Sequence, residues 1–140
     1  MDESVRAQRI APLLARMHQA YGLYVDVDDG WLPIIVTLDK RIAKIDPHYR
    51  ILQIKEKFGG LRFYYELSDN VIGQGDIIVD ELVEFAEYVC WSICEKCGAY
   101  GTLRTERSWV KTLCDSCDDD VTQLKYDENT TKWAAKEQES

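Results

Sequence analysis

Apolar residues recur at helical spacing in two segments near the start of the chain. Residues 3–21 carry one apolar stripe that ends at Gly22, and Pro12 is expected to kink or split this helix. Residues 31–45 repeat the helical pattern, and Asp46-Pro47 ends it. The pattern therefore predicts two helices with a polar stretch between them.

The period then changes from that of a helix to that of a strand. Residues 49–67 alternate around Gly59-Gly60, which predicts a β-hairpin that turns at the glycine pair. A third helix follows at about residues 76–93. Its predicted buried stripe consists of Ile78, Leu82, Phe85, Ala86, Val89 and Ile93.

These elements predict an α+β fold in which helices pack on a small antiparallel sheet or hairpin. Residues 1–93 form the predicted α+β core, residues 94–121 a zinc ribbon and residues 122–140 a polar tail. The length of 140 residues fits one domain with a small satellite. Hydrophobic residues make up 46% of the chain and charged residues 30%, which excludes a wholly disordered class.

Four cysteines form two closely spaced pairs near the end of the chain. Cys94 and Cys97 make one pair, and Cys114 and Cys117 make the other. Two such pairs direct four thiolates at one tetrahedral ion, and the intervening residues have the length of a two-stranded ribbon. A reducing cytosol favours one Zn²⁺ over disulfides. Four thiolates close the coordination shell, so we expect a structural ion that stabilises a segment too small to fold by burial alone.

The negative charge lies in the second half of the chain. Residues 1–70 carry ten basic and ten acidic residues, whereas residues 71–140 carry seven and fifteen, which gives the net charge of −8. A negative protein repels nucleic acid and attracts basic partners, although acidity also serves solubility. The acidic, polar start and the absence of a long apolar run predict a cytoplasmic protein with no membrane segment.

A row of carboxylates follows one side of the third helix. The spacing of three or four residues places Asp76, Asp80, Glu84 and Glu87 on a common face. This row is a candidate partner-binding surface, and a solvated helix face is the simpler interpretation. A divalent-ion site for a hydrolase or nuclease is the third interpretation, and it lacks a clustered base.

Basic and aromatic residues gather in two other places. The hairpin carries Lys55, Lys57 and Arg62 among aromatic residues, and the ribbon carries Arg104, Arg107, Trp109 and Lys111. Basic groups with stacking aromatics can bind single-stranded nucleic acid. A hairpin with alternate aromatics in the core is the competing structural explanation.

The remaining candidates predict no chemistry. His18 and His48 have no visible partner in a shared site, so we expect surface or capping roles. Cys90 lies one helical turn before Cys94 and is expected to be a small buried residue rather than a reactive thiol. We therefore expect no catalytic residues and no enzyme.

The chain resembles a group of small, largely uncharacterised proteins encoded by tailed phages and prophages. The resemblance rests on Gly30-Trp31, on the motif KEKFGGLRFYY at residues 55–65, and on the residues around the paired cysteines, and it covers about residues 30–117. It implies no transferable activity, but it raises the expectation of a host-takeover or counter-defence protein. The leading hypothesis is a non-enzymatic, zinc-stabilised inhibitor that contacts a host protein through the ribbon and the acidic helix. The alternatives are a nucleic-acid-binding regulator and, third, a metal-dependent hydrolase.

Overall fold

The computed structural model describes residues 1–118, 124–127 and 132–135. The fold is α+β, with three α-helices in the described residues and sheets that are largely antiparallel. The elements in chain order are α1 (Glu3–Arg16), η1 (Gln19–Tyr21), β1 (Val25–Asp26), η2 (Asp29–Trp31), α2 (Leu32–Ile45), β2 (Arg50–Lys57), β3 (Gly60–Glu66), α3 (Gly75–Cys90), β4 (Thr102–Arg104), β5 (Lys111–Leu113), β6 (Leu124–Asp127) and β7 (Lys132–Ala135).

The central sheet has the strand order β1-β2-β3. The hairpin of β2 and β3 is antiparallel, and the short β1 adds to it in parallel, with Val25 opposite Ile54. The turn lies at Phe58 and Gly59, whose φ angles are 53° and 87°, and not at Gly59-Gly60 as predicted. Two successive positive φ angles match the right-handed twist of the strands, so Gly60 is free to begin β3 opposite Lys57.

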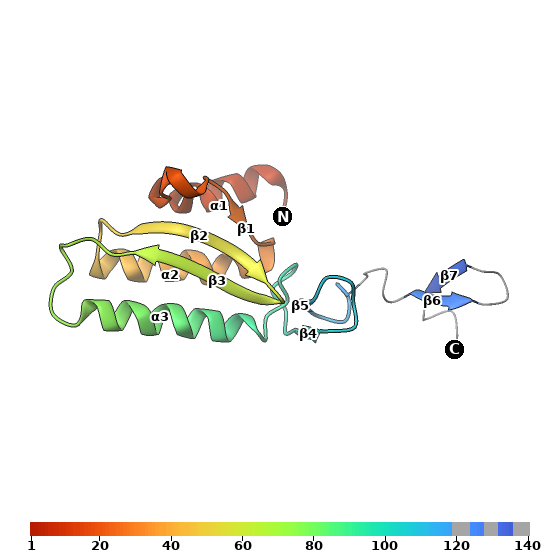
Figure 1. The fold of residues 1–140 in the computed structure, drawn as a ribbon. Coiled ribbons are helices and arrows are strands. Elements are labelled where there is room, and N and C mark those ends of the chain that lie inside the picture. Colours follow the sequence, from red (N-terminus) through yellow and green to blue (C-terminus); the bar gives the residue numbers. More distant parts are fainter. Residues whose placement is uncertain (119–123, 128–131, 136–140) are drawn as a thin grey trace.

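The helices form a layer against one face of this sheet. Figure 1 shows α2 behind the two long strands, α1 on the side of β1 and α3 along β3, and no helix lies in front of the strands in this view. The core between the layers consists of aliphatic and aromatic side chains, with Trp31 and Tyr49 the largest that are fully buried. The opposite face of the sheet is therefore left without a helical cover.

The first helix is shorter than predicted. Asp2 caps α1 by accepting a hydrogen bond from the Val5 amide, and the helix continues through Pro12 before it ends at Arg16. The backbone then leaves the helix because Met17 pairs with Ile51 of β2, whose carbonyl accepts the His18 amide at 2.9 Å. The predicted segment 17–21 therefore contains this bridge and the short η1.

The core buries the apolar stripe predicted for α3 only in part: Ala86 is buried, and Leu82 is partly buried against the core. Ile78 and Phe85 are 49% and 64% exposed, so the prediction was wrong for both. The buried side chains of α3 are Val79, Val83, Ala86 and Cys90. Both sets have helical spacing, and they lie on adjacent sides of the helix. As a result, an apolar strip of α3 remains at the surface.

Two buried carboxylates join elements that are distant in sequence. Asp39 of α2 accepts a hydrogen bond from the Tyr49 hydroxyl and forms a 2.6 Å ion pair with Arg16 of α1. Asp46, at the end of α2, accepts hydrogen bonds from the backbone and hydroxyl of Ser68 at 2.7 and 2.6 Å. These bonds satisfy carboxylates that would otherwise be costly to bury.

The C-terminal part contains two short antiparallel strand pairs, β4-β5 and β6-β7. Strands β4 and β5 pair between the two cysteine pairs, and Thr102 lies opposite Leu113. In the predicted polar tail, β6 and β7 form an antiparallel pair. Residues 119–123, 128–131 and 136–140, which belong to the predicted ribbon end and tail, lie outside the described residues.

Candidate metal centre

The four paired cysteines meet at one point. The sulfur atoms of Cys94, Cys97, Cys114 and Cys117 all lie within 4.8 Å of one another, and those of Cys97 and Cys114 are 3.6 Å apart. Sulfurs at about 2.3 Å from a tetrahedral ion lie roughly 3.8 Å from each other. The arrangement therefore fits a four-coordinate metal ion, and the four cysteines can hold one.

The backbone around Cys94 is arranged for a thiolate. Burial favours the neutral thiol, but the N–H groups of Cys114, Cys97 and Lys96 donate to this sulfur and lower the pKa of Cys94 to about 7. Gly98 turns the chain after the first pair with a φ of 85°. A thiolate that accepts amide hydrogens is the form of cysteine that binds metal.

Two arginines of the ribbon lie beside acidic residues of the second cysteine knuckle. Arg104 forms a 2.7 Å ion pair with Asp115 and donates to the Leu113 carbonyl, while Arg107 lies 3.4 Å from Asp118. These contacts fix the loop that carries Cys114 and Cys117. Arg104 and Arg107 were predicted as possible nucleic-acid contacts, and the structure places both in ion pairs within the ribbon.

The first cysteine knuckle packs directly on the α+β core. The Gly30 amide donates to the Glu95 carbonyl at 2.6 Å, and the Trp31 indole donates to the Ile93 carbonyl at 2.8 Å. A Cβ at Gly30 would lie only 2.1 Å from the Cys94 carbonyl oxygen. Gly30-Trp31 is therefore a docking point for the metal centre.

The tip of the hairpin forms a second docking point for the ribbon. Thr112 of β5 is buried, and its hydroxyl donates to the Gly59 carbonyl at 2.7 Å. At the neighbouring Gly60, a Cβ would lie 2.5 Å from the Trp91 ring, so the close packing of Trp91 on the hairpin requires glycine at position 60. Gly30-Trp31, Gly59 and Thr112 therefore meet at the boundary between core and ribbon.

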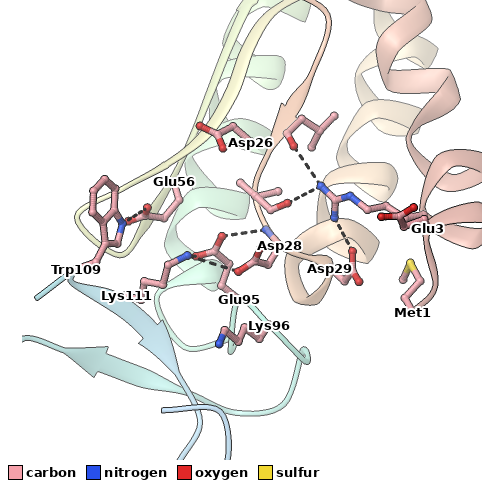
Figure 2. A pocket seen from close by; sticks show the side chains of 13 residues that line it. Met1, Glu3, Asp26, Asp28, Asp29, Glu56, Glu95, Lys96, Trp109 and Lys111 are labelled. Carbon is pink, nitrogen blue, oxygen red and sulfur yellow. Dashed lines mark hydrogen bonds and ion pairs between the residues drawn. The ribbon is translucent and has the colours of Figure 1, made fainter. Parts of the chain in front are cut away.

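A pocket of about 820 Å³ lies at this boundary, next to the metal centre. Figure 2 shows Lys111 reaching from the ribbon to Glu95 and Asp28, at 3.1 and 3.5 Å, while Trp109 donates to Glu56 of β2 at 2.9 Å. Glu95 is 1% exposed and also accepts the Asp28 amide at 2.9 Å. Lys111 and Trp109, which were predicted nucleic-acid contacts, thus fasten the ribbon to the core.

The basic residues of the hairpin have a different placement. Lys55 and Arg62 are directly opposite each other on β2 and β3, and the Lys55 ammonium lies 5.8 Å from the Tyr64 ring centroid. Lys57 lies 5.8 Å from the Phe58 ring centroid at the turn. We call the surface formed by Lys55, Lys57, Arg62 and Tyr64 the open sheet face. The residues that alternate with them, such as Ile54 and Phe63, are buried in the core on the other face of the sheet. Within the described part of the chain, none of these three cations forms an ion pair.

The acidic row of α3 lies beside the edge strand β3. Glu87 accepts the Phe63 amide at 3.0 Å, and Asp80 accepts the Tyr65 hydroxyl at 3.1 Å. Burial, the bond to Asp80 and the charges of the row raise the pKa of Tyr65 to about 12. Asp76 and Glu84 are exposed. The row therefore covers an open sheet edge and still presents charge to solvent.

Other candidate chemistry is sparse in the described residues. There, the cysteine cluster is the one group of three or more potential ligands close enough to hold an ion, so the acidic row forms no such group. Burial and nearby carboxylates raise the pKa of Cys90 to about 12, which keeps it a thiol. The His18 ring nitrogen caps the Ala20 amide at 3.1 Å. Among the described helices, none combines the length and apolar character needed to cross a bilayer.

The site includes two residues to which the sequence pattern assigned no role. Glu95 and Thr112 are buried, and both make polar contacts across the boundary between core and ribbon. In the sequence, Glu95 is only the neighbour of a paired cysteine, and Thr112 is only a residue of the expected ribbon. A charged residue between two ligand cysteines is ordinarily exposed, so its burial had no sequence signal. Comparison of the chain with protein-family models, curated proteins and solved structures finds no match.

Proposed function

We propose that this protein is a non-enzymatic binding module, stabilised by one structural Zn²⁺, that occupies a basic site on a protein partner. Zinc suits four thiolates in a tetrahedral arrangement, and a closed sulfur shell leaves no position for a substrate or an activated water. The ion's contribution would be to hold the ribbon folded against the core. The binding surface would be the outer side of α3 together with the neighbouring ribbon.

The observation that carries this proposal is the mixed surface of α3. Exposed carboxylates of Asp76, Asp80 and Glu84 are interspersed with Ile77 and Tyr88, which are 53% and 73% exposed. Large apolar side chains at the surface mark interaction sites when they group together. Carboxylates around them select a basic partner and speed its approach. Such a surface would compete with nucleic acid for a basic groove.

The resemblance of residues 30–117 to small phage and prophage proteins is the reason for placing the partner in a bacterial host. A phage protein that blocks a host nucleic-acid-binding site would need an acidic surface on a rigid scaffold. The contacts at Gly30, Gly59 and Thr112 join the ribbon to the core and support that rigidity.

The test is capture of protein partners from a bacterial lysate, with and without nuclease treatment, by the zinc-loaded chain and by Asp76→Lys/Glu84→Lys. Neither side chain makes a hydrogen bond or ion pair within the described residues, so the variant should keep the fold. We expect the variant to lose a partner that the native chain retains, and salt to weaken that partner's binding.

The matched control is Glu3→Lys/Asp69→Lys, which changes the net charge equally at exposed positions outside α3. It should retain the partner. Equal loss in both variants would show a nonspecific charge effect, and retention in both would refute the role of the acidic row. A signal that disappears on nuclease treatment would favour the second candidate.

The second candidate is single-stranded nucleic acid on the open sheet face. It is favoured by the opposed Lys55 and Arg62 and by the Lys55–Tyr64 stack, which place basic groups and an aromatic ring on one uncovered surface. Binding of a labelled oligothymidylate should fall steeply with salt. Lys55→Glu/Arg62→Glu should abolish it, whereas Arg9→Glu/Lys40→Glu, with two exposed cations reversed elsewhere, should not. No binding at low salt would eliminate this candidate.

A further inference from the structure

The apolar strip of α3 that the core leaves uncovered forms one wall of a surface groove. The groove has a volume of about 360 Å³, and α2 supplies its other wall. Ile34 and Leu38 of α2 face Leu82 and Phe85 of α3 across it. Phe85 is 64% exposed, which is unusual for a large side chain in the middle of a helix at helical spacing with other apolar residues.

The two walls carry opposite charge. Arg41 lines the groove on α2, and the exposed Lys44 lies one turn further along the same side. On α3, Glu81 lies one turn before Phe85 and is exposed, and Glu84 is its neighbour on the outer side. The groove thus has a basic rim along α2 and an acidic rim along α3.

The helices run in opposite directions, since Ile45 at the end of α2 lies beside Gly75 at the start of α3. A two-fold axis parallel to the groove would place α2 of one subunit over α3 of the other. The basic rim would then face the acidic rim twice. A two-fold axis across the groove would instead oppose the two basic rims and the two acidic rims, which charge repulsion disfavours.

From this self-complementary pattern we infer that the groove is the interface of a homodimer, in which the occupant is a second copy of this chain. The Phe85 side chains and their apolar neighbours form the centre of the interface. The pairing of Arg41 with Glu81 of the partner subunit determines the relative orientation of the two subunits, with α2 of one over α3 of the other. A two-fold interface uses one patch twice, so a groove with one basic and one acidic rim needs no other partner. The interface is distinct from the part of the acidic row around Asp80, which lies on the side of α3 next to β3, whereas Glu84 belongs to both the row and this rim.

The test is sedimentation equilibrium of the zinc-loaded full chain over a range of concentrations up to roughly 0.1 mM. The native chain, with a mass of 16.2 kDa per copy, should approach twice that mass. Phe85→Glu should weaken association at least tenfold, because it places a charge at the centre of the interface. Tyr21→Glu, at an exposed position on η1, is the matched control and should leave association unchanged.

Charge exchange tests the direction of the pairing. Arg41→Glu and Glu81→Arg should each weaken association, and the double variant should restore it. A chain that stays monomeric over the whole range would overturn the inference, as would a dimer unaffected by Phe85→Glu. Single variants that weaken a dimer without rescue in the double variant would overturn the placement of α2 over α3. Circular dichroism and bound metal confirm that each variant is folded.

Discussion

The amide of Gly30 donates a 2.6 Å hydrogen bond to the carbonyl of Glu95, the residue that directly follows the first cysteine of the metal centre. This bond joins η2 to the knuckle, although the two residues are far apart in sequence. A side chain at position 30 would contact the carbonyl oxygens of Cys94 and Glu95 at 2.1 and 2.5 Å. The metal centre and the core therefore share one rigid boundary.

Replacing Gly30 with alanine should destabilise the protein and loosen metal binding. The added Cβ meets backbone atoms, which cannot rotate away, so we expect a loss of about 3 kcal/mol or more in the free energy of unfolding. Denaturant unfolding and competition with a chelator measure the two effects. Gly73→Ala is a comparison with no atom within 4 Å of its Cβ, and only the backbone strain of its φ of 65° should cost stability, about 1 kcal/mol. An equal cost at both positions would contradict the docking role of Gly30.

The metal should depend on the four paired cysteines and not on the fifth. We expect one equivalent of zinc per native chain by elemental analysis, and an unchanged equivalent in Cys90→Ala. Cys94→Ser should lose most of the bound metal and, because the apo ribbon buries little surface, should also lower the melting temperature. A chelator should reproduce that shift in the native chain. Full occupancy in Cys94→Ser would contradict a four-sulfur site.

The pair of buried Glu95 and partly exposed Lys111 should show strong energetic coupling. Lys111→Met leaves the Glu95 charge buried without its partner and should cost about 3 kcal/mol, whereas Glu95→Gln leaves a lysine that water still reaches and should cost about 1 kcal/mol. The double variant should cost less than the sum by about 1–3 kcal/mol. Denaturant unfolding of the four proteins completes the cycle. Additive costs would mean that the 3.1 Å contact does not contribute to stability.

Asp46 should contribute stability that depends on pH. Burial favours its neutral form, but hydrogen bonds from Ser68 and the His48 amide outweigh burial and hold its pKa below the ordinary 3.8. The stabilisation is therefore complete above the ordinary value and is lost as pH falls through it towards the lowered one. Asp46→Asn should cost about 1–3 kcal/mol near neutral pH, and this difference should shrink below about pH 4.

The difference between the native chain and Asp46→Asn is the quantity to measure, by denaturant unfolding at a series of pH values. Both proteins carry the same cysteines, so metal loss in acid affects both and cancels in the difference. A difference that stays constant from neutral to acid pH would show that the Asp46 bonds do not depend on its charge.

Local patterns predicted most elements because their causes are local. The spacing of the cysteine pairs alone brings two sulfurs together in each knuckle, and alternation predicted the hairpin. The turn prediction missed Phe58, since a non-glycine residue at φ 53° has no clear sequence mark. The first helix was predicted to end at residue 21, but it ends at Arg16, where Met17 forms a bridge to Ile51. Such a long-range contact cannot be predicted from local spacing.

The third helix shows why periodicity could not identify the buried side. Its apolar residues cover two adjacent strips, one through Val79 and Val83 and one through Ile78 and Phe85, and both satisfy the helical period. Only the position of α2 and the sheet decides which strip is buried. The contacts of Lys111 and Trp109 were hidden for the same reason, because their partners lie on other elements.

The bond from the Thr112 hydroxyl to the Gly59 carbonyl links the hairpin tip to the strand that precedes Cys114. We therefore expect the affinity for a metal ion to depend on the whole chain and not on the four sulfurs alone. A synthetic peptide limited to residues 91–118 would have to order itself at the moment of chelation, whereas in the intact protein the hairpin and η2 already supply a template. The excised peptide should accordingly release its metal to a competing chelator sooner than the parent molecule does.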